Sequence, residues 1–286
     1  MKILVTGARG QLGADVMREL ILRGHDAFGV DKEEMDITDC QSVLRVMNDV
    51  RPQAVIHCAA WTAVDAAEDE CNKVFVKKVN ADGTENVAKE CFKHNAKMLY
   101  LSTDYVFDGK GNEAWKPDCE EYKPLNVYGE TKLAGKRAVA AALDEYFIVR
   151  IAWVFGKSGN NFIKTMLKLA QTHNSLRVVN DQIGTPTYTY DLARLLADMI
   201  ETEKYGYYHA TNEGGYVSWA DFAEEIFRQA GLSVTVVPVS TEEYGLSKAA
   251  RPRNSRLDKS KLTENGFKLL PAWQDALKRY LKELGY

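Results

Sequence analysis

The stretch KILVTGARGQLG, residues 2–13, gives the clearest indication of the fold. A short apolar run leads into three evenly spaced glycines and then into an amphipathic stretch. A strand, tight turn and helix in this order bind the diphosphate of a dinucleotide, because the helix start offers free N–H groups and a partial positive charge. A plain turn is the alternative, but the position at the first strand-to-helix junction favours dinucleotide binding. The predicted contacts are Gly7, Gly10, Gln11, Leu12 and Gly13.

Beyond this turn, apolar runs alternate with helical patterns over roughly the first 155 residues. Such alternation is typical of β-α-β units and a parallel sheet. We therefore expect an α/β fold, a Rossmann-type doubly wound parallel sheet. Strands are predicted at residues 2–6, 27–30, 54–59, 97–102 and 146–154. Helices are predicted at residues 13–23, 41–50 and 74–95, with a further one around Lys132.

The second half of the chain changes character. Amphipathic helix patterns cover residues 162–172, 190–201, 219–230 and 272–284, and residues 234–239 resemble a strand outside the main alternation. We expect residues 1–155 to form the dinucleotide-binding domain and residues 156–286 mainly a smaller substrate-binding lobe, with some later helices returning to the first sheet. No linker separates the two parts, so a ligand cleft is expected at their interface.

The composition is that of a soluble globular protein, with 45% hydrophobic residues, 27% charged residues and a net charge of −3. The absence of a basic excess argues against a nucleic-acid partner, and no apolar run approaches the roughly 18 residues that span a bilayer. A cytoplasmic location is expected. The five cysteines form no C-x-x-C pair and the five histidines no ligand cluster, so the sequence predicts neither disulfides nor catalysis by a metal.

Asp31 ends the second predicted strand, where an acidic residue binds the ribose hydroxyls of a dinucleotide. Its charge disfavours the 2′-phosphate of NADP, but Arg9 in the glycine turn could offset it, so NADPH and NADH both stay open. Asp36 and Ile37 are placed against the adenine, with a simple loop role as the alternative.

The third predicted strand ends in His57-Cys58-Ala59-Ala60. The two alanines would let a flat cofactor pass close to the backbone. His57 and Cys58 are expected to be packed core residues, because no partner for a catalytic triad is visible.

Residues 126–135, NVYGETKLAG, place Tyr128 and Lys132 four residues apart, on one face of a helix. Ser102, Thr103 and Asp104 lie at the end of the fourth predicted strand, at the sheet edge where ligands bind. Each feature alone fits a solvated helix or a capped turn. Together with a dinucleotide-binding turn, they form the set of groups that a reductase needs.

In this set, a Tyr with a reference pKa near 10 donates a proton, and Lys132 stabilises the phenolate. Thr103 would hydrogen-bond the substrate oxygen. We therefore predict Thr103, Tyr128 and Lys132 as the catalytic residues.

These motifs identify a resemblance to the extended short-chain dehydrogenase/reductase family, over nearly the whole chain. The segments STDYVFDG, NNFIKTML and VVNDQIGTPT narrow it to the reductases of dTDP-linked 4-dehydro sugars. The resemblance implies that NADPH or NADH reduces the C4 ketone of dTDP-4-dehydro-β-L-rhamnose to dTDP-L-rhamnose, for polysaccharide synthesis. It also implies further ligand contacts: Ala60, Thr62, Tyr128 and Lys132 to the cofactor, Thr103, Asp104 and Trp153 to the deoxysugar, and Asn160, Asn161, Gln182, Arg251 and Asn254 to the nucleotide diphosphate.

Two other functions stay open at this point. A sugar-nucleotide epimerase or dehydratase of the same fold would return its cofactor unchanged, and no additional acid–base pair is visible for that chemistry. A non-catalytic NADP-binding regulatory subunit, such as the similar beta subunit of methionine adenosyltransferase, is disfavoured by the intact Thr103, Tyr128 and Lys132.

The resemblance also raises the question of assembly. Some relatives dimerise through Mg²⁺ held by carboxylates, and Asp15 and Glu283 are candidates here. Residues 189–191 do not clearly supply a third carboxylate, so a homodimer and a monomer both stay open.

Overall fold

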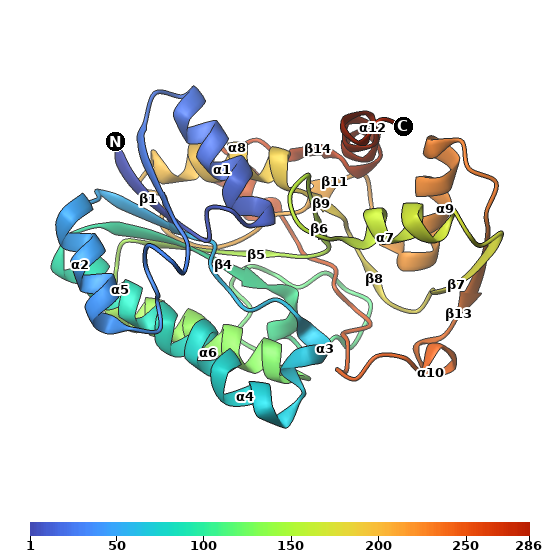
Figure 1. The fold of residues 1–286 in the computed structure, drawn as a ribbon, viewed down its shortest axis with the longest axis horizontal. Helices are drawn as coiled ribbons and strands as arrows, with labels where there is room; N and C mark the ends of the chain where they lie inside the picture. Colours follow the sequence, from blue (N-terminus) through green and yellow to red (C-terminus); the bar gives the residue numbers. More distant parts are fainter.

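The computed structural model describes residues 1–286 and contains one central six-stranded parallel sheet (Figure 1). The strand order is β10-β5-β4-β3-β1-β2. The strands are β1 (Lys2–Thr6), β2 (Asp26–Val30), β3 (Ala54–His57), β4 (Lys97–Thr103), β5 (Tyr146–Ile151) and β10 (Gly206–His209). The predicted Rossmann-type parallel sheet is therefore confirmed.

Helices cover both faces of this sheet (Figure 1). One face packs against α1 (Gln11–Leu22) and α8 (Thr189–Ile200), and the other against α2 (Cys40–Val50), α5 (Thr84–Lys93) and α6 (Val127–Ala142). Successive side chains of a strand point to opposite faces, so Ile3 and Val5 enter one core and Leu4 the other. Burial on both faces explains the continuous apolar runs of the central strands.

The chain order changes at β1, which lies between β2 and β3. In a doubly wound sheet, ligands bind outside the carboxyl ends of the strands at this point. The glycine turn, residues 7–10, leaves β1 here, and the loops after β2, β3 and β4 emerge at the same edge. The fold thus gathers four of the predicted motifs at one place.

A smaller lobe lies beside this sheet (Figure 1). Its core joins α7 (Phe162–Leu169), α9 (Trp219–Ala230) and α12 (Trp273–Leu284). The predicted strand outside the main alternation is confirmed, because β13 (Thr235–Val239) pairs in parallel with β7 (Ser175–Val179) in a separate two-stranded sheet. The remaining elements are β6 (Val154–Phe155), β8 (Ile183–Gly184), β9 (Thr187–Tyr188), β11 (Asn212–Glu213), β12 (Val217–Ser218), α10 (Thr241–Tyr244), α11 (Ser260–Glu264) and β14 (Leu270–Ala272). Of these, α11 and β14 return to the central sheet, where Leu262 and Leu270 join its core.

The structure differs from the prediction at three elements. The helix predicted at residues 74–95 is divided into α4 (Glu70–Lys77), a π-helical turn η1 (Lys78–Gly83) and α5. The strand predicted at residues 146–154 ends at Ile151, because Trp153 has a φ of 50° and no extended strand passes through that conformation. A sixth strand, β10, was not predicted, because four residues beside a glycine carry too short a pattern.

The wide turn η1 has a visible structural consequence. The side chain of Asn80, which is fully buried, accepts a hydrogen bond from the Trp61 N–H at 2.8 Å and donates to the Trp61 carbonyl at 3.1 Å. This fixes the loop after β3, which leads into α3 (Val64–Ala67). None of the helices combines the length and apolar character needed to cross a membrane.

Candidate active site

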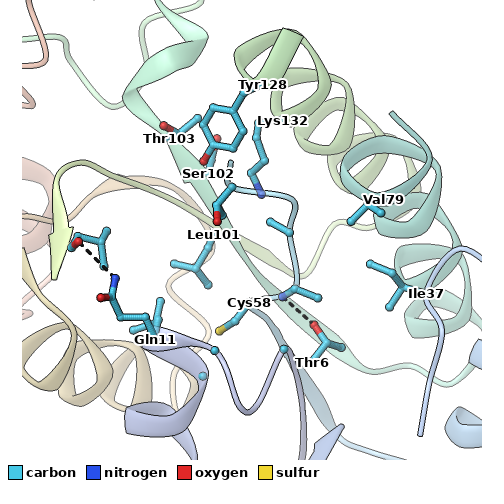
Figure 2. Close-up of a pocket in the computed structure, with 18 of the residues that line it drawn as sticks. Thr6, Gln11, Ile37, Cys58, Val79, Leu101, Ser102, Thr103, Tyr128 and Lys132 are labelled. Atoms are coloured by element: carbon cyan, nitrogen blue, oxygen red, sulfur yellow. Dashed lines mark hydrogen bonds between the residues drawn. The ribbon is translucent and has the colours of Figure 1, made fainter. Parts of the chain in front are cut away.

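A cavity of about 590 Å³ opens at the carboxyl edge of the sheet (Figure 2). The glycine turn, the loops after β2, β3 and β4, and the first turns of α6 all contribute to it. The structure brings most of the predicted site residues together around this cavity: Gly7, Gly10, Gln11, Leu12, Gly13, Asp31, Asp36, Ile37, Ala60, Thr62, Thr103, Asp104, Tyr128, Lys132 and Trp153.

Neither Gly7 nor Gly13 has room for a side chain. Gly7 has a φ of +65°, and a Cβ on it would lie 2.8 Å from the Ala59 nitrogen. A Cβ on Gly13 would lie 2.1 Å from the Gly7 carbonyl oxygen. Gly10 caps α1 without any side-chain hydrogen bond, so the first N–H groups of this helix remain available to a diphosphate. This part of the cavity therefore fits a dinucleotide.

The loop after β2 forms the next part of the wall. Asp31 accepts a hydrogen bond on Oδ2 from the backbone N–H of Arg9, at 2.8 Å, which joins the loop to the glycine turn. Asp36 accepts from the N–H and the hydroxyl of Thr38, at 2.9 and 2.7 Å. Burial acts to raise the pKa of Asp36, but these hydrogen bonds outweigh it and lower the pKa overall. Asp36 thus shapes its own loop while bordering the cavity.

His57 is a buried structural residue, as predicted. Its Nδ1 pairs with the Thr6 hydroxyl at 2.7 Å and its Nε2 with the Thr84 hydroxyl at 3.1 Å. Burial lowers the pKa of His57 to about 3, and the charge of Lys132 acts in the same direction. The ring is therefore neutral at physiological pH.

Cys58 differs from its prediction, because it borders the cavity and is only half-buried. Burial nevertheless raises the pKa of its thiol to about 12, against the opposing charge of Lys132. A thiol of this kind is not a nucleophile at neutral pH.

Thr103 and Asp104 lie where β4 ends, and both are buried. The Thr103 hydroxyl accepts from the Tyr105 N–H at 3.2 Å and donates to Asp104 Oδ1 at 3.0 Å. The other oxygen of Asp104, Oδ2, is buried and has no hydrogen-bond partner. Burial raises the pKa of Asp104 to about 6, although the nearby hydroxyls of Ser255 and Thr103 oppose the shift.

Tyr128 and Lys132 enter the cavity from the first turns of α6. Asn126 caps this helix by accepting from the Gly129 N–H at 2.8 Å, and Gly129 lies against Tyr105 so closely that a Cβ would be 2.3 Å from its carbonyl oxygen. The helix start is thereby pressed against the end of β4. Figure 2 shows the Tyr128 ring beside Ser102 and Thr103, with the Lys132 side chain one turn further along and directed into the cavity.

The environment of this pair favours a proton donor next to a titratable amine. Tyr128 is half-buried, and burial together with the Asp104 charge raises the pKa of its phenol, so it is protonated at neutral pH. Lys132 is buried, and its Nζ lies 4.2 Å from the centroid of the Tyr100 ring. Burial lowers the pKa of Lys132 to about 7.

The residues predicted to contact the nucleotide diphosphate lie elsewhere. Gln182 and Arg251 border a second cavity of about 330 Å³, together with Arg177 and Trp219. Val64 borders the first cavity and its neighbour Asp65 the second.

The three asparagines predicted for the same ligand border neither cavity. Asn161 caps α7 and donates to Gln11 Oε1 at 3.0 Å, while Asn160 is exposed. Asn254 is buried and donates to the carbonyls of Lys110 and Glu113, at 3.2 and 2.8 Å, so in this structure it holds a loop.

Sequence reasoning missed two supporting residues. Ser255 is buried and acts to lower the pKa of the Asp104 carboxyl, and Asp65 binds Arg251, with Nη2 and Oδ2 2.7 Å apart. The basic run RPRNSRLD indicated a binding role for its arginines and none for the serine among them. No local pattern linked Asp65 to a residue 186 positions away.

The residues present do not fit a magnesium site. Asp15 is bound by Arg18 at 2.8 Å and Thr189 at 2.5 Å, and Glu283 accepts from the Tyr188 hydroxyl at 2.9 Å. No group of three or more His, Cys, Asp or Glu side chains is arranged to hold a metal ion.

A parallel sheet with a glycine turn at its switch point, and a Tyr-x-x-x-Lys helix at the same edge, defines the class of Rossmann-type proteins known as extended short-chain dehydrogenases/reductases. The family model described as RmlD substrate binding domain matches residues 1–286. The chain belongs to this family, and the resemblance inferred from its motifs is confirmed.

Named relatives span nearly the whole chain. A dTDP-4-dehydrorhamnose reductase from Aggregatibacter actinomycetemcomitans is 40% identical over 291 residues, covering 97% of this chain and 97% of that protein. The spore coat polysaccharide biosynthesis protein SpsK from Bacillus subtilis is 39% identical over 282 residues, covering 99% and 97%. The crystal structure of dTDP-4-dehydrorhamnose reductase from Bacillus anthracis in complex with NADP is similar at a TM-score of 0.94 and 43% identity, covering 99% of this chain and 100% of that one.

Proposed function

We propose that this protein is an oxidoreductase that reduces the C4 ketone of dTDP-4-dehydro-β-L-rhamnose to dTDP-L-rhamnose with NADPH or NADH. This is the last step in making that sugar nucleotide, for use in polysaccharide synthesis. The observation that carries the proposal is the position of Tyr128 and Lys132, which border the same cavity as the glycine turn. The similarity to named dTDP-4-dehydrorhamnose reductases over nearly the whole chain supports the choice of substrate.

The chain's own residues then take distinct roles. When bound, the reduced nicotinamide supplies the hydride. Thr103 turns its hydroxyl from Asp104 Oδ1 to the C4 oxygen, donates a hydrogen bond to it and positions it against Tyr128. The Tyr128 hydroxyl donates its proton to that oxygen, and the Lys132 ammonium stabilises the phenolate that remains. A positioned proton donor of this kind contributes roughly a hundred- to ten-thousand-fold in rate.

The substrate is proposed to extend from the first cavity towards the second. Asp104, with a buried oxygen that has no partner, would accept a hydrogen bond from a sugar hydroxyl, and Trp153 would contact the sugar ring. Trp153 is stacked on Trp219, with ring centroids 3.6 Å apart, which holds it in place. Arg177 and Arg251 in the second cavity supply cations for the diphosphate, since a guanidinium binds two oxygens at once.

The experiment that tests this proposal combines purified protein with the dTDP-keto sugar and each reduced cofactor. One molecule of cofactor is expected to be oxidised for each molecule of dTDP-L-rhamnose formed. An epimerase or dehydratase would convert the sugar without net oxidation of the cofactor. Cofactor binding without any turnover of the sugar would favour the regulatory subunit.

The buried carboxyl of Asp104 predicts a pH dependence. Because burial raises its pKa to about 6, the group is ionised above pH 6 and becomes protonated as the pH falls through that value. The hydrogen bond that it accepts from the sugar is then lost. We expect kcat/KM for the sugar to fall below pH 6, by about tenfold for each pH unit, at saturating cofactor.

Two variants check the assignment to Asp104. Asp104→Asn should have a low kcat/KM that no longer changes between pH 5 and 6. Asp198→Asn, at an exposed carboxylate that pairs with Arg23 far from the cavity, should keep the wild-type profile. An unchanged acid limb in Asp104→Asn would assign the titration to another group.

A further inference from the structure

A group of five charged residues surrounds the ribose end of the first cavity. Residues 31–34, Asp-Lys-Glu-Glu, follow β2, and Arg9 reaches them from the glycine turn. Arg9 Nη1 binds Glu33 Oε2 at 3.0 Å, and its Nη2 binds Glu34 Oε1. Each terminal nitrogen of the guanidinium therefore donates to one glutamate.

The same loop fixes the residue that faces the ribose. Asp31 accepts on Oδ2 from the Arg9 N–H at 2.8 Å, and its own N–H donates to Glu34 Oε2 at 3.0 Å. Asp31 and Lys32 border the cavity. An acid at this position binds the 2′-hydroxyl of NAD, whereas an arginine nearby accommodates the 2′-phosphate of NADP. Arg9, whose Nε lies 3.8 Å from Asp31 Oδ2, is therefore placed beside this position.

The pairing of charges here opposes a phosphate. The cations beside the carboxylates of Asp31, Glu33 and Glu34 already have partners: Arg9 pairs with these carboxylates, Lys32 lies over the Phe75 ring at 5.5 Å, and Arg45 donates to the Glu34 carbonyl at 3.2 Å. A 2′-phosphate would compete with Glu33 and Glu34 for the N–H groups of Arg9. The two glutamates would also repel the phosphate.

We propose that Glu33 and Glu34 set the cofactor selectivity of this protein by holding Arg9 and by adding negative charge beside the adenosine 2′-position, which weakens NADPH relative to NADH. The inference rests on the proposed function for the class of cofactor and goes beyond it in naming the residues that choose between the two. These ion pairs are exposed and hence individually weak, so they shift the ratio of affinities and do not exclude NADPH.

The test measures dissociation constants for NADP⁺ and NAD⁺ by isothermal titration calorimetry, without any sugar. In Glu33→Gln/Glu34→Gln, the ratio Kd(NADP⁺)/Kd(NAD⁺) is expected to fall about tenfold. Adding Arg9→Ala to this variant should return the ratio to the wild-type value or above, because the released guanidinium is the group that gains the phosphate. The gain in NADP⁺ affinity should diminish as salt is raised, since the contact is exposed.

A matched control removes two carboxylates elsewhere. Glu85→Gln/Glu225→Gln also breaks two exposed ion pairs within helices, with Lys89 and Arg228, and should leave the ratio unchanged. An unchanged ratio in Glu33→Gln/Glu34→Gln, or an equal shift in the control, would overturn the proposal. The titration contains no sugar, so its result does not depend on the proposed reaction. Failure of that reaction would be seen in the separate turnover assay, as normal cofactor affinities without turnover of the dTDP-keto sugar.

Discussion

Replacing Tyr128 by Phe is expected to lower kcat for the dTDP-keto sugar by roughly a thousandfold, within the range for a lost proton donor. The variant keeps the ring, which packs edge-on against Tyr105 with centroids 5.5 Å apart, and removes only the hydroxyl. Cofactor affinity should therefore change little. The measurements are steady-state turnover and calorimetric titration with NADP⁺, carried out on the same preparation.

A matched control is Tyr146→Phe, which removes a hydroxyl that contacts Tyr207 outside the cavity. It should retain wild-type turnover. If Tyr128→Phe also kept full turnover, the phenol could not be the donor, and the assigned chemistry would have to be abandoned.

Replacing Lys132 by Met is expected to lower kcat by roughly a hundredfold or more while making the folded protein more stable at neutral pH. The activity falls because the Tyr128 phenolate loses the cation that stabilises it. The stability rises because burial lowers the pKa of Lys132 to about 7, which means that the charged amine is disfavoured in the folded state.

The sign of the stability change follows from linkage. The pKa of the amine is lower in the folded protein than in the unfolded chain, where it is near 10.4. The resulting decrease in the free energy of unfolding is absent above about pH 10, grows as the pH falls, and is complete below about pH 7.

Met fills a similar volume without charge, and it forfeits the contact with the Tyr100 ring. We expect a net gain of about 1–3 kcal/mol in the free energy of unfolding at pH 7, and little or none at pH 10. Urea unfolding at both pH values measures this. A variant that is inactive and also less stable at pH 7 would indicate a structural role for Lys132.

Local patterns predicted the features that short stretches of sequence specify. The β1 run, the glycines of the turn and the alternation of strands and helices each lie within one contiguous segment, so the parallel sheet followed from them. Trp219–Ala230 matches its predicted helix at both ends, because Ser218 caps it in a capping box and Gly231 ends it with a φ of 68°.

Features that depend on distant parts of the chain were harder to predict. The strand β10 is short and gains its place only by pairing with β5. The end of β5 depends on the unusual backbone of Trp153, whose ring packs on Trp219 and against Gly184.

Within the candidate site, the motifs identified which residues face the cavity but not how their charges are balanced. Arg9 and Asp31 were recognised as opposing influences on the cofactor. The structure adds that Glu33 and Glu34 bind the arginine. Likewise Asp104 was recognised at the end of its strand, whereas Ser255, which acts on its pKa, lies 151 residues further along the sequence.

The most direct test of the account follows the hydride itself. Cofactor carrying deuterium at the transferable position of C4 of the nicotinamide ring would be incubated with the dTDP-keto sugar, and the product analysed by NMR and mass spectrometry. The account predicts one deuterium at C4 of the rhamnose for each molecule of cofactor oxidised. A product without deuterium at C4, or one formed while the cofactor stays reduced, would contradict it.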